Sequence, residues 1–222
     1  MTGLPAFSAP VTLVGGGEVG ADDLRQARLH APHVVAADSG AEHVLAAGFL
    51  PEVVIGDLDS ISEKARRAIP SDRLFRIVEQ DSSDFDKCLR LIDAPLLIAV
   101  GFTGARLDHT LAAFATISRK ASPPTIILGA EDIAFRAPEN LDLDLPAGLR
   151  LSLFPMGEAR GVSTGLHWPI DGITFAPAGF NGISNRVSGP VGLRIEGPMI
   201  VILPRQALDR IFTQLLFQLR DA

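Results

Sequence analysis

The sequence has one cysteine, no long apolar run and no excess of basic residues among its 222 residues. Because Cys88 is alone, one chain can form neither an internal disulfide nor a cysteine-based zinc cluster, and the cytoplasm is the expected compartment. No run approaches the roughly 20 apolar residues of a membrane span, and residues 1–10 lack the features of a secretory signal. The net charge of −6 gives no general attraction to nucleic acid or to an anionic membrane, so neither is expected as a partner.

The standard phosphate-binding motifs are also missing. Gly15-Gly16-Gly17 follows the first apolar run, but it lacks both the Gly-x-Gly-x-x-Gly spacing and the lysine of a P-loop. The chain shows neither an internal repeat nor a low-complexity tract. With 47% hydrophobic and 21% charged residues, the composition is that of an ordinary globular protein with one large domain or two small ones.

From Val11 to about Leu128, short apolar runs alternate with segments of helical period. This alternation predicts an α/β domain with a mostly parallel, Rossmann-like sheet, in which ligands bind at the carboxyl ends of the strands. The expected strands are Val11–Val14, His33–Ala37, Val53–Ile55, Leu74–Val78, Leu96–Val100 and Thr125–Leu128. The expected helices are Asp22–His30, Ala41–Ala47, Ser62–Ile69, Ser83–Ile92 and Leu107–Arg119.

After Pro138 the helical period disappears and short strands separated by glycine and proline are expected. We therefore place a domain boundary near 138–147, with an α/β domain over 1–140 and a small all-β sandwich over 141–222. Apolar residues at helical spacing predict a final amphipathic helix over Gln206–Arg220, packed on its own domain or on a second subunit. The strands expected in the second domain are Leu141–Leu145, Leu149–Phe154, Ile173–Phe175, Val191–Glu196 and Met199–Leu203.

Two acids, Asp57 and Asp59, stand where the third expected strand ends. If the backbone stays extended there, both carboxylates point to one face, and their repulsion must be relieved by protonation, a basic partner or a metal cation. The alternative is a polar turn that ends in a helix cap, with Ser60 as the N-cap of the next helix.

Further polar groups follow the next strands. Asp81 lies just before the expected helix over Ser83–Ile92, and Asp84 lies in its first turn. Ser83 supplies a cap for this helix, and a cap alone does not require both acids. Arg106 follows a glycine-bearing loop and offers a planar fork for phosphate oxygens. Because the carboxyl ends of parallel strands share one edge, these groups can converge, and a cluster of carboxylates suits Mg²⁺ together with a nucleotide.

Five short segments, taken in order, carry a family resemblance that spans nearly the whole chain. They are Ala37-Asp38-Ser39-Gly40-Ala41, Gly56-Asp57-Leu58-Asp59-Ser60, Gln80-Asp81-Ser82-Ser83-Asp84-Phe85-Asp86-Lys87, Arg106-Leu107-Asp108-His109 and Ser184-Asn185. In this order they resemble thiamine pyrophosphokinases. The resemblance implies transfer of the pyrophosphoryl group of ATP to the hydroxyl of thiamine, giving thiamine diphosphate and AMP. It also implies a homodimer whose active sites lie between subunits.

The resemblance also implies roles for single residues. Asp57, Asp59 and Asp84 match magnesium-binding carboxylates, and Asp108 matches an acid that binds metal or orients substrate. Asp38, Ser39, Gly40, Gln80, Lys87 and Arg106 match positions near the nucleotide or its phosphates, and Arg106 joins the four acids Asp57, Asp59, Asp84 and Asp108 as a catalytic residue.

Thiamine would then be bound by the second domain. Trp168, Ser184 and Asn185 match the family there, and an aromatic face with small hydrogen-bonding groups suits a cationic heteroaromatic ring. An ordinary core position is the alternative for Trp168. Two other functions stay open for the whole chain: a different Mg²⁺-dependent nucleotide pyrophosphohydrolase that uses water, and a non-catalytic regulator that binds thiamine or a nucleotide.

Overall fold

A computed structural model describes residues 6–79, 81–104, 106–182 and 184–220. The chain divides into two compact units: residues 1–116 with 121–129, and residues 117–120 with 130–222. The predicted boundary at 140/141 falls after strand β7 (Asp132–Arg136), whereas this division places β7 in the second unit. The reason is pairing, because β7 forms an antiparallel ladder with β13 (Met199–Pro204) of that unit.

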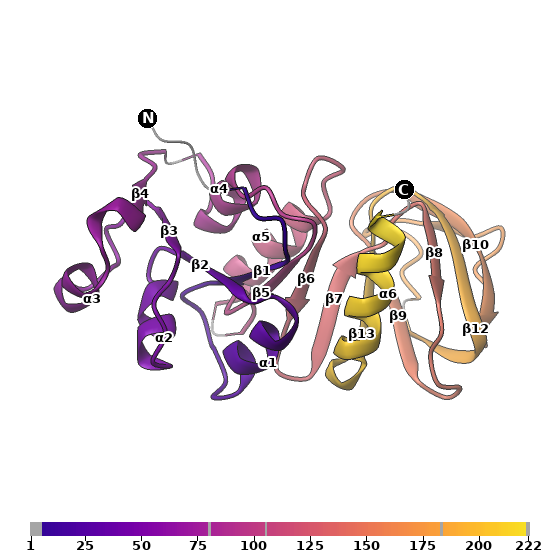
Figure 1. Ribbon diagram of the computed structural model, residues 1–222. Coiled ribbons are helices and arrows are strands. Elements are labelled where there is room, and N and C mark those ends of the chain that lie inside the picture. Colours follow the sequence, from indigo (N-terminus) through magenta and orange to yellow (C-terminus); the bar gives the residue numbers. More distant parts are fainter. Residues whose placement is uncertain (1–5, 80, 105, 183, 221–222) are drawn as a thin grey trace. The chain divides into compact units, whose positions relative to one another are not determined.

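The first unit holds parallel strands in the order β6-β5-β1-β2-β3-β4, with helices between them along the chain (Figure 1). Every pair of neighbours in this row is parallel, as the alternation predicted. The strands are β1 (Val11–Val14), β2 (His33–Ala37), β3 (Val53–Gly56), β4 (Leu74–Arg76), β5 (Leu97–Val100) and β6 (Thr125–Leu128). All residues of β1, β3, β5 and β6 are buried, as expected for a sheet covered on both faces.

The helices of the first unit fall within two residues of their predicted bounds, apart from a short 3₁₀ turn, η1 (Ser71–Arg73). Ser62, and not Ser60, caps α3, because its hydroxyl accepts a hydrogen bond from the N–H of Ala65. Ser83 caps α4 through the N–H of Asp86, as predicted. The helices are α1 (Asp23–His30), α2 (Gly40–Ala46), α3 (Glu63–Ala68), α4 (Asp84–Leu91) and α5 (Leu107–Ile117).

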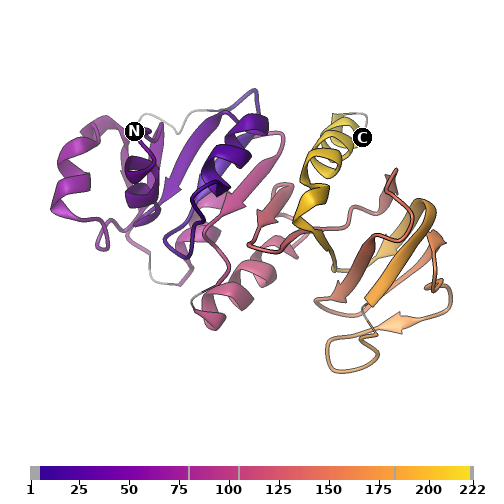
Figure 2. The same cartoon turned by 90° about the horizontal axis from the view of Figure 1, so that it is seen from below.

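The second unit is built from antiparallel strands and ends in a helix, α6 (Leu208–Arg220), which is yellow in Figures 1 and 2. Its strands are β7 and β13 together with β8 (Asn140–Leu143), β9 (Arg150–Pro155), β10 (Ala159–Leu166), β11 (Thr174–Phe175) and β12 (Ser184–Glu196). The sequence did not predict β7, β10 or the first half of β12. A 3₁₀ turn, η2 (Arg205–Ala207), precedes α6. None of the helices formed by the described residues combines the length and apolar character that a membrane-spanning segment requires.

Candidate active site

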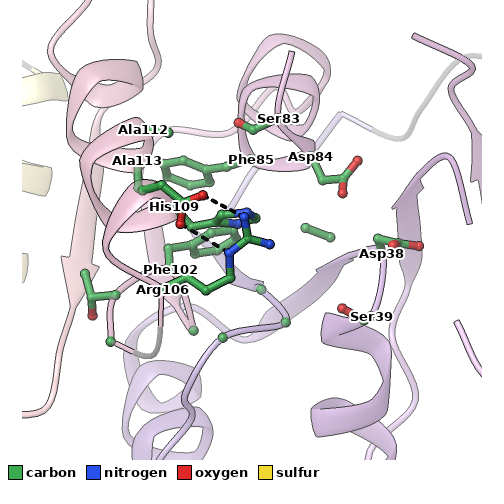
Figure 3. Close-up of a pocket in the computed structure, with 18 of the residues that line it drawn as sticks. Asp38, Ser39, Ser83, Asp84, Phe85, Phe102, Arg106, His109, Ala112 and Ala113 are labelled. Carbon is green, nitrogen blue, oxygen red and sulfur yellow. Dashed lines mark hydrogen bonds and ion pairs between the residues drawn. The ribbon is translucent and has the colours of Figure 1, made fainter. Parts of the chain in front are cut away.

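A pocket of about 570 Å³ lies in the first unit at the carboxyl ends of its strands (Figure 3). The loops after β1, β2 and β5 line it together with the first turns of α4 and α5. Asp38 and Ser39 lie on one side of the pocket, while Phe102, His109 and Ala113 lie on the other. Five residues predicted for the site line this pocket: Asp38, Ser39, Asp84, Arg106 and Asp108.

The acidic turn after β3 does not continue as an extended strand. Leu58 has a φ of 63°, a left-handed conformation that non-glycine residues rarely adopt, and the N–H of Asp59 donates to Oδ1 of Asp57 (3.2 Å). That hydrogen bond lowers the pKa of Asp57 below its usual value. The two carboxylates therefore approach each other through a turn, so the condition of an extended backbone is not met.

Asp38 completes the acidic group. It is 4% exposed, its φ is 44°, and its Oδ1 atom has no hydrogen-bond partner among the described residues. Burial, followed by the negative charge of Asp84, raises the pKa of Asp38, although a hydrogen bond with Ser60 acts in the opposite direction. Asp57 and Asp59 add to that repulsion, so a cation would relieve a real electrostatic cost here.

The three acids after β2 and β3 fit a divalent cation. One carboxylate oxygen from each of Asp38, Asp57 and Asp59 lies within 4.8 Å of the others. The unpartnered Oδ1 of Asp38 is an available ligand atom, and hard cations such as Mg²⁺ prefer oxygen ligands of this kind. Sequence reasoning assigned Asp38 to the nucleotide; the available signal was its place at the end of β2, next to β3 in the sheet.

Asp84 lines the same pocket but is outside this group of three. Its Oδ1 accepts a hydrogen bond from Nζ of Lys87 (3.0 Å), one helical turn further on in α4. Burial lowers the pKa of Lys87, but the hydrogen bond and the charge of Asp84 outweigh it, so the pKa lies above its usual value. Lys87 is 2% exposed and therefore reaches the pocket only through Asp84.

Arg106 and Asp108 form a two-pronged ion pair at the start of α5. Nε and Nη2 of Arg106 donate to the two carboxylate oxygens of Asp108 at 3.2 and 2.6 Å. This pairing lowers the pKa of Asp108 to about 2. Both side chains are about two-thirds exposed, so the guanidinium can exchange this partner for a phosphate.

The remaining predicted residues of the first unit are placed as follows. Gly40 opens α2 and packs against β1 so closely that a Cβ there would come within 2.0 Å of the carbonyl oxygen of Val14. Gln80 lies outside the described residues.

The residues predicted for thiamine all lie in the second unit. Ser184 and Asn185 open β12, and Trp168 follows β10. The Trp168 side chain is 53% exposed, which argues against an ordinary core position. Asn185 is 9% exposed and hydrogen-bonds the backbone of Trp168.

Comparison with known proteins gives concordant results. The family model for the catalytic domain of thiamin pyrophosphokinase matches residues 24–128. The thiamine pyrophosphokinase of Bacillus subtilis (strain 168) is 37% identical over 84 residues, which are 35% of this chain and 39% of that relative. The chain is thus matched to about two-fifths of the length of this relative.

Solved structures resemble the fold over more of the chain. The thiamin pyrophosphokinase of Geobacillus thermodenitrificans matches with a TM-score of 0.71 and 21% identity over 88% of this chain and 96% of that one. The yeast enzyme matches with a TM-score of 0.71 and 18% identity over 94% of this chain and 90% of that one.

Fold and pocket together define the first unit as an α/β domain with an acid-lined pocket. Its residues 24–128 match the family model for the catalytic domain of thiamin pyrophosphokinase, and the resemblance found in the sequence is confirmed.

Proposed function

We propose that this protein transfers the pyrophosphoryl group of ATP to the hydroxyl of thiamine, giving thiamine diphosphate and AMP. The observation that carries the proposal is the group of three acids, Asp38, Asp57 and Asp59, within the segment that matches the family's catalytic domain. In this group the buried Oδ1 of Asp38 has no hydrogen-bond partner among the described residues. In the reaction, the thiamine hydroxyl oxygen bonds to the β-phosphorus of ATP. The bond from that phosphorus to the α–β bridging oxygen breaks, and AMP leaves.

We assign the charged residues by what they contact. Asp57, Asp59 and Asp84 are the proposed Mg²⁺ ligands. We add Asp38 because one of its carboxylate oxygens lies within 4.8 Å of those of the first two and because its Oδ1 has no hydrogen-bond partner among the described residues. A Mg²⁺ ion bound there would neutralise charge on the ATP phosphates. Lys87 limits the freedom of Asp84 through their hydrogen bond.

Arg106 and the polar loops act on the nucleotide. The Arg106 fork binds phosphate oxygens, and Asp108 holds that fork in place until the nucleotide arrives. Ser39 lines the pocket, and Gly40 follows it at the start of α2. We assign both to the nucleotide, and we assign Gln80 to it on the family resemblance alone. Positioning and neutralisation of charge supply most of the catalysis in phosphoryl transfer.

On the thiamine side, Trp168 offers an exposed aromatic face, and Ser184 and Asn185 lie at the start of the neighbouring strand. We interpret the first unit as Rossmann-like and the second as a β-sandwich. We also propose a homodimer with active sites between subunits, as the family resemblance implies, and a cytoplasmic location, for which the single cysteine is the argument.

The deciding experiment is to incubate the full chain with ATP, Mg²⁺ and thiamine and to identify the products. We expect AMP and thiamine diphosphate in equal amounts. The appearance of ADP alone would overturn the proposal. Turnover of ATP to AMP that ignores thiamine would also overturn it and would favour the pyrophosphohydrolase. Binding of thiamine or ATP with no turnover at all would favour the non-catalytic regulator.

A further inference from the structure

Strand β12 lies between β9 and β10 in the sheet order. Residues Ser184–Arg186 pair with β9, whereas the register with β10 covers Val187 and then Gly192–Glu196. The ladder with β10 is interrupted at Gly165, whose φ is 70° and where a Cβ would lie 2.0 Å from the carbonyl oxygen of Pro190. Where a ladder is interrupted, peptide groups of the neighbouring segment need other hydrogen bonds.

Asn185 supplies those hydrogen bonds to Trp168. Its Nδ2 donates to the carbonyl oxygen of Trp168 (2.6 Å), and its Oδ1 accepts from the N–H of Trp168 (3.2 Å). The backbone of Asn185 pairs with Leu151 of β9, while the N–H of His167 donates to the carbonyl oxygen of Arg186 (2.8 Å). The Asn185 side chain therefore adds hydrogen bonds next to a backbone contact between β12 and the segment after β10. The same Oδ1 also accepts from the N–H of Arg186 (2.8 Å).

This arrangement leaves Asn185 little capacity for a ligand. Three of the four hydrogen-bonding positions of its amide are occupied, and the side chain is buried. Trp168, in contrast, is half exposed, and among the described residues its ring has an edge-on contact with His167 at 4.5 Å between centroids. The backbone of Trp168 is therefore fixed while about half of the residue's surface stays exposed to a ligand.

We propose that Asn185 is a positioning residue for thiamine binding: it fixes the backbone of Trp168 so that the indole presents its face to the cationic ring of thiamine. The inference rests on the proposed function, and it separates two residues that the sequence assigned together. Trp168 contacts the ligand, and Asn185 acts through Trp168. Attraction between a cation and an indole face depends on ring orientation, which explains why the backbone must be held.

Trp168 is the only tryptophan in the chain, so intrinsic fluorescence reports on this residue alone. The variant Asn185→Asp keeps the shape of the side chain but places an oxygen against the carbonyl oxygen of Trp168. Asn140→Asp makes the same chemical change at an exposed position in β8 and serves as the matched control. Fluorescence anisotropy of the ligand-free chains measures how firmly Trp168 is held, and calorimetric titration with thiamine measures the affinity.

For Asn185→Asp we expect lower anisotropy and a thiamine Kd raised on the order of tenfold. Trp168→Ala should weaken thiamine binding to a similar degree. The variant with both Asn185→Asp and Trp168→Ala should bind no more weakly than Trp168→Ala alone, because Asn185 acts only through Trp168 and the two effects are then not additive. With thiamine saturating, kcat of Asn185→Asp should stay near that of the unaltered chain. Asn140→Asp should match the unaltered chain throughout.

Three results would overturn the proposal. In the first, the two single effects multiply in the double variant, which places Asn185 in direct contact with thiamine. In the second, Asn185→Asp binds thiamine as tightly as the unaltered chain. In the third, Trp168→Ala keeps full affinity, a result that decides the matter even if Asn185→Asp does not fold. If the unaltered chain neither binds thiamine nor forms thiamine diphosphate, the proposed function is wrong as well. This result is obtained before any variant is made, so it is distinguishable from failure of the Asn185 proposal alone.

Discussion

The side-chain amide of Gln218 pairs with the backbone of Asp142 as a neighbouring strand would. Its Nε2 donates to the carbonyl oxygen (2.7 Å) and its Oε1 accepts from the N–H (3.2 Å). Gln214, one helical turn earlier, does the same with Asp144 at 3.3 and 2.7 Å. Residues four apart on a helix lie on one face, and residues two apart on a strand turn their peptide groups to one edge. The last helix, α6, thus packs on its own domain and covers the edge of β8 that faces away from β12.

Removing both amides should open this edge. We expect the double change Gln214→Ala and Gln218→Ala to lower the free energy of unfolding by about 2 kcal/mol, because exposed peptide groups regain water in place of four hydrogen bonds. Hydrogen exchange at the amides of Asp142 and Asp144 should become faster. Gln206→Ala, at an exposed position in η2, is the control. Unchanged exchange at those two amides would show that the glutamine pairing does not protect the edge.

The first unit was easier to predict than the second because its signal is local. A buried parallel strand is a continuous apolar run, as in Val11–Val14, and it can be recognised without knowing its partner. Strand β10 has the sequence Ala-Arg-Gly-Val-Ser-Thr-Gly-Leu, with two glycines and few apolar residues, and was missed. It is a strand because β12 pairs with it, and that information lies some 30 residues away along the chain.

The acids of the site were identified from the sequence, but their grouping was not. Asp57 and Asp59 were joined because they are two residues apart, whereas Asp38 was assigned by its neighbours Ser39 and Gly40. Strands β2 and β3 are neighbours in the sheet, which brings Asp38 close to Asp57 and Asp59. The left-handed backbone of Leu58 turns Asp57 and Asp59 toward Asp38. A local sequence motif predicts neither the order of strands in a sheet nor a single unusual φ, so the grouping of these acids could not be predicted.

Replacing Asp38 with a neutral residue should affect Mg²⁺ binding without lowering the stability of the fold. Without Mg²⁺, Asp38→Asn should melt at the same or a higher temperature than the unaltered chain, because a buried and repelled charge is gone. Mg²⁺ at 100 times its Kd should stabilise the unaltered chain by about 2.7 kcal/mol and the variant by much less. Turnover should be nearly abolished, and we expect the same of Asp59→Asn with the fold retained.

Thermal unfolding with and without Mg²⁺ measures these shifts. Asp72→Asn, an exposed acid in η1, should behave like the unaltered chain. An Asp38→Asn chain that keeps the full Mg²⁺ shift would remove Asp38 from the metal site, and full activity of Asp59→Asn would remove Asp59.

The pair Arg106 and Asp108 should affect ATP use and leave folding nearly unchanged. Arg106→Lys loses the planar fork, so kcat/KM for ATP should fall by on the order of 10- to 100-fold, as expected for a lost hydrogen bond between charged groups. Asp108→Asn should give a smaller loss, because Arg106 stays charged but is no longer held. Initial rates over a range of ATP concentrations measure both effects, and unchanged kcat/KM in Arg106→Lys would contradict the assignment.

The pH dependence of this pair has a definite sign. The folded pKa of Asp108 is about 2, below its ordinary value of 3.8, so its pairing with Arg106 is complete above pH 3.8 and is lost only as the pH falls through 2. The activity profile between pH 5 and 9 should therefore show no limb due to Asp108. A limb in that range that disappears in Asp108→Asn would contradict the low pKa.

Gly56 is expected to be essential for the placement of Asp38. A Cβ at this position would lie 2.8 Å from the Cβ of Asp38, closer than two such atoms can approach, and both residues sit in packed backbone at the strand ends. We expect Gly56→Ala to lower the free energy of unfolding by about 1–3 kcal/mol through overpacking. It should also weaken the Mg²⁺-dependent shift in melting temperature, because Asp38 must move. Gly189→Ala, where an added Cβ meets nothing within 4 Å, is the control. A Gly56→Ala chain that keeps both its stability and its Mg²⁺ response would show that the approach of Asp38 to β3 is not needed for the site.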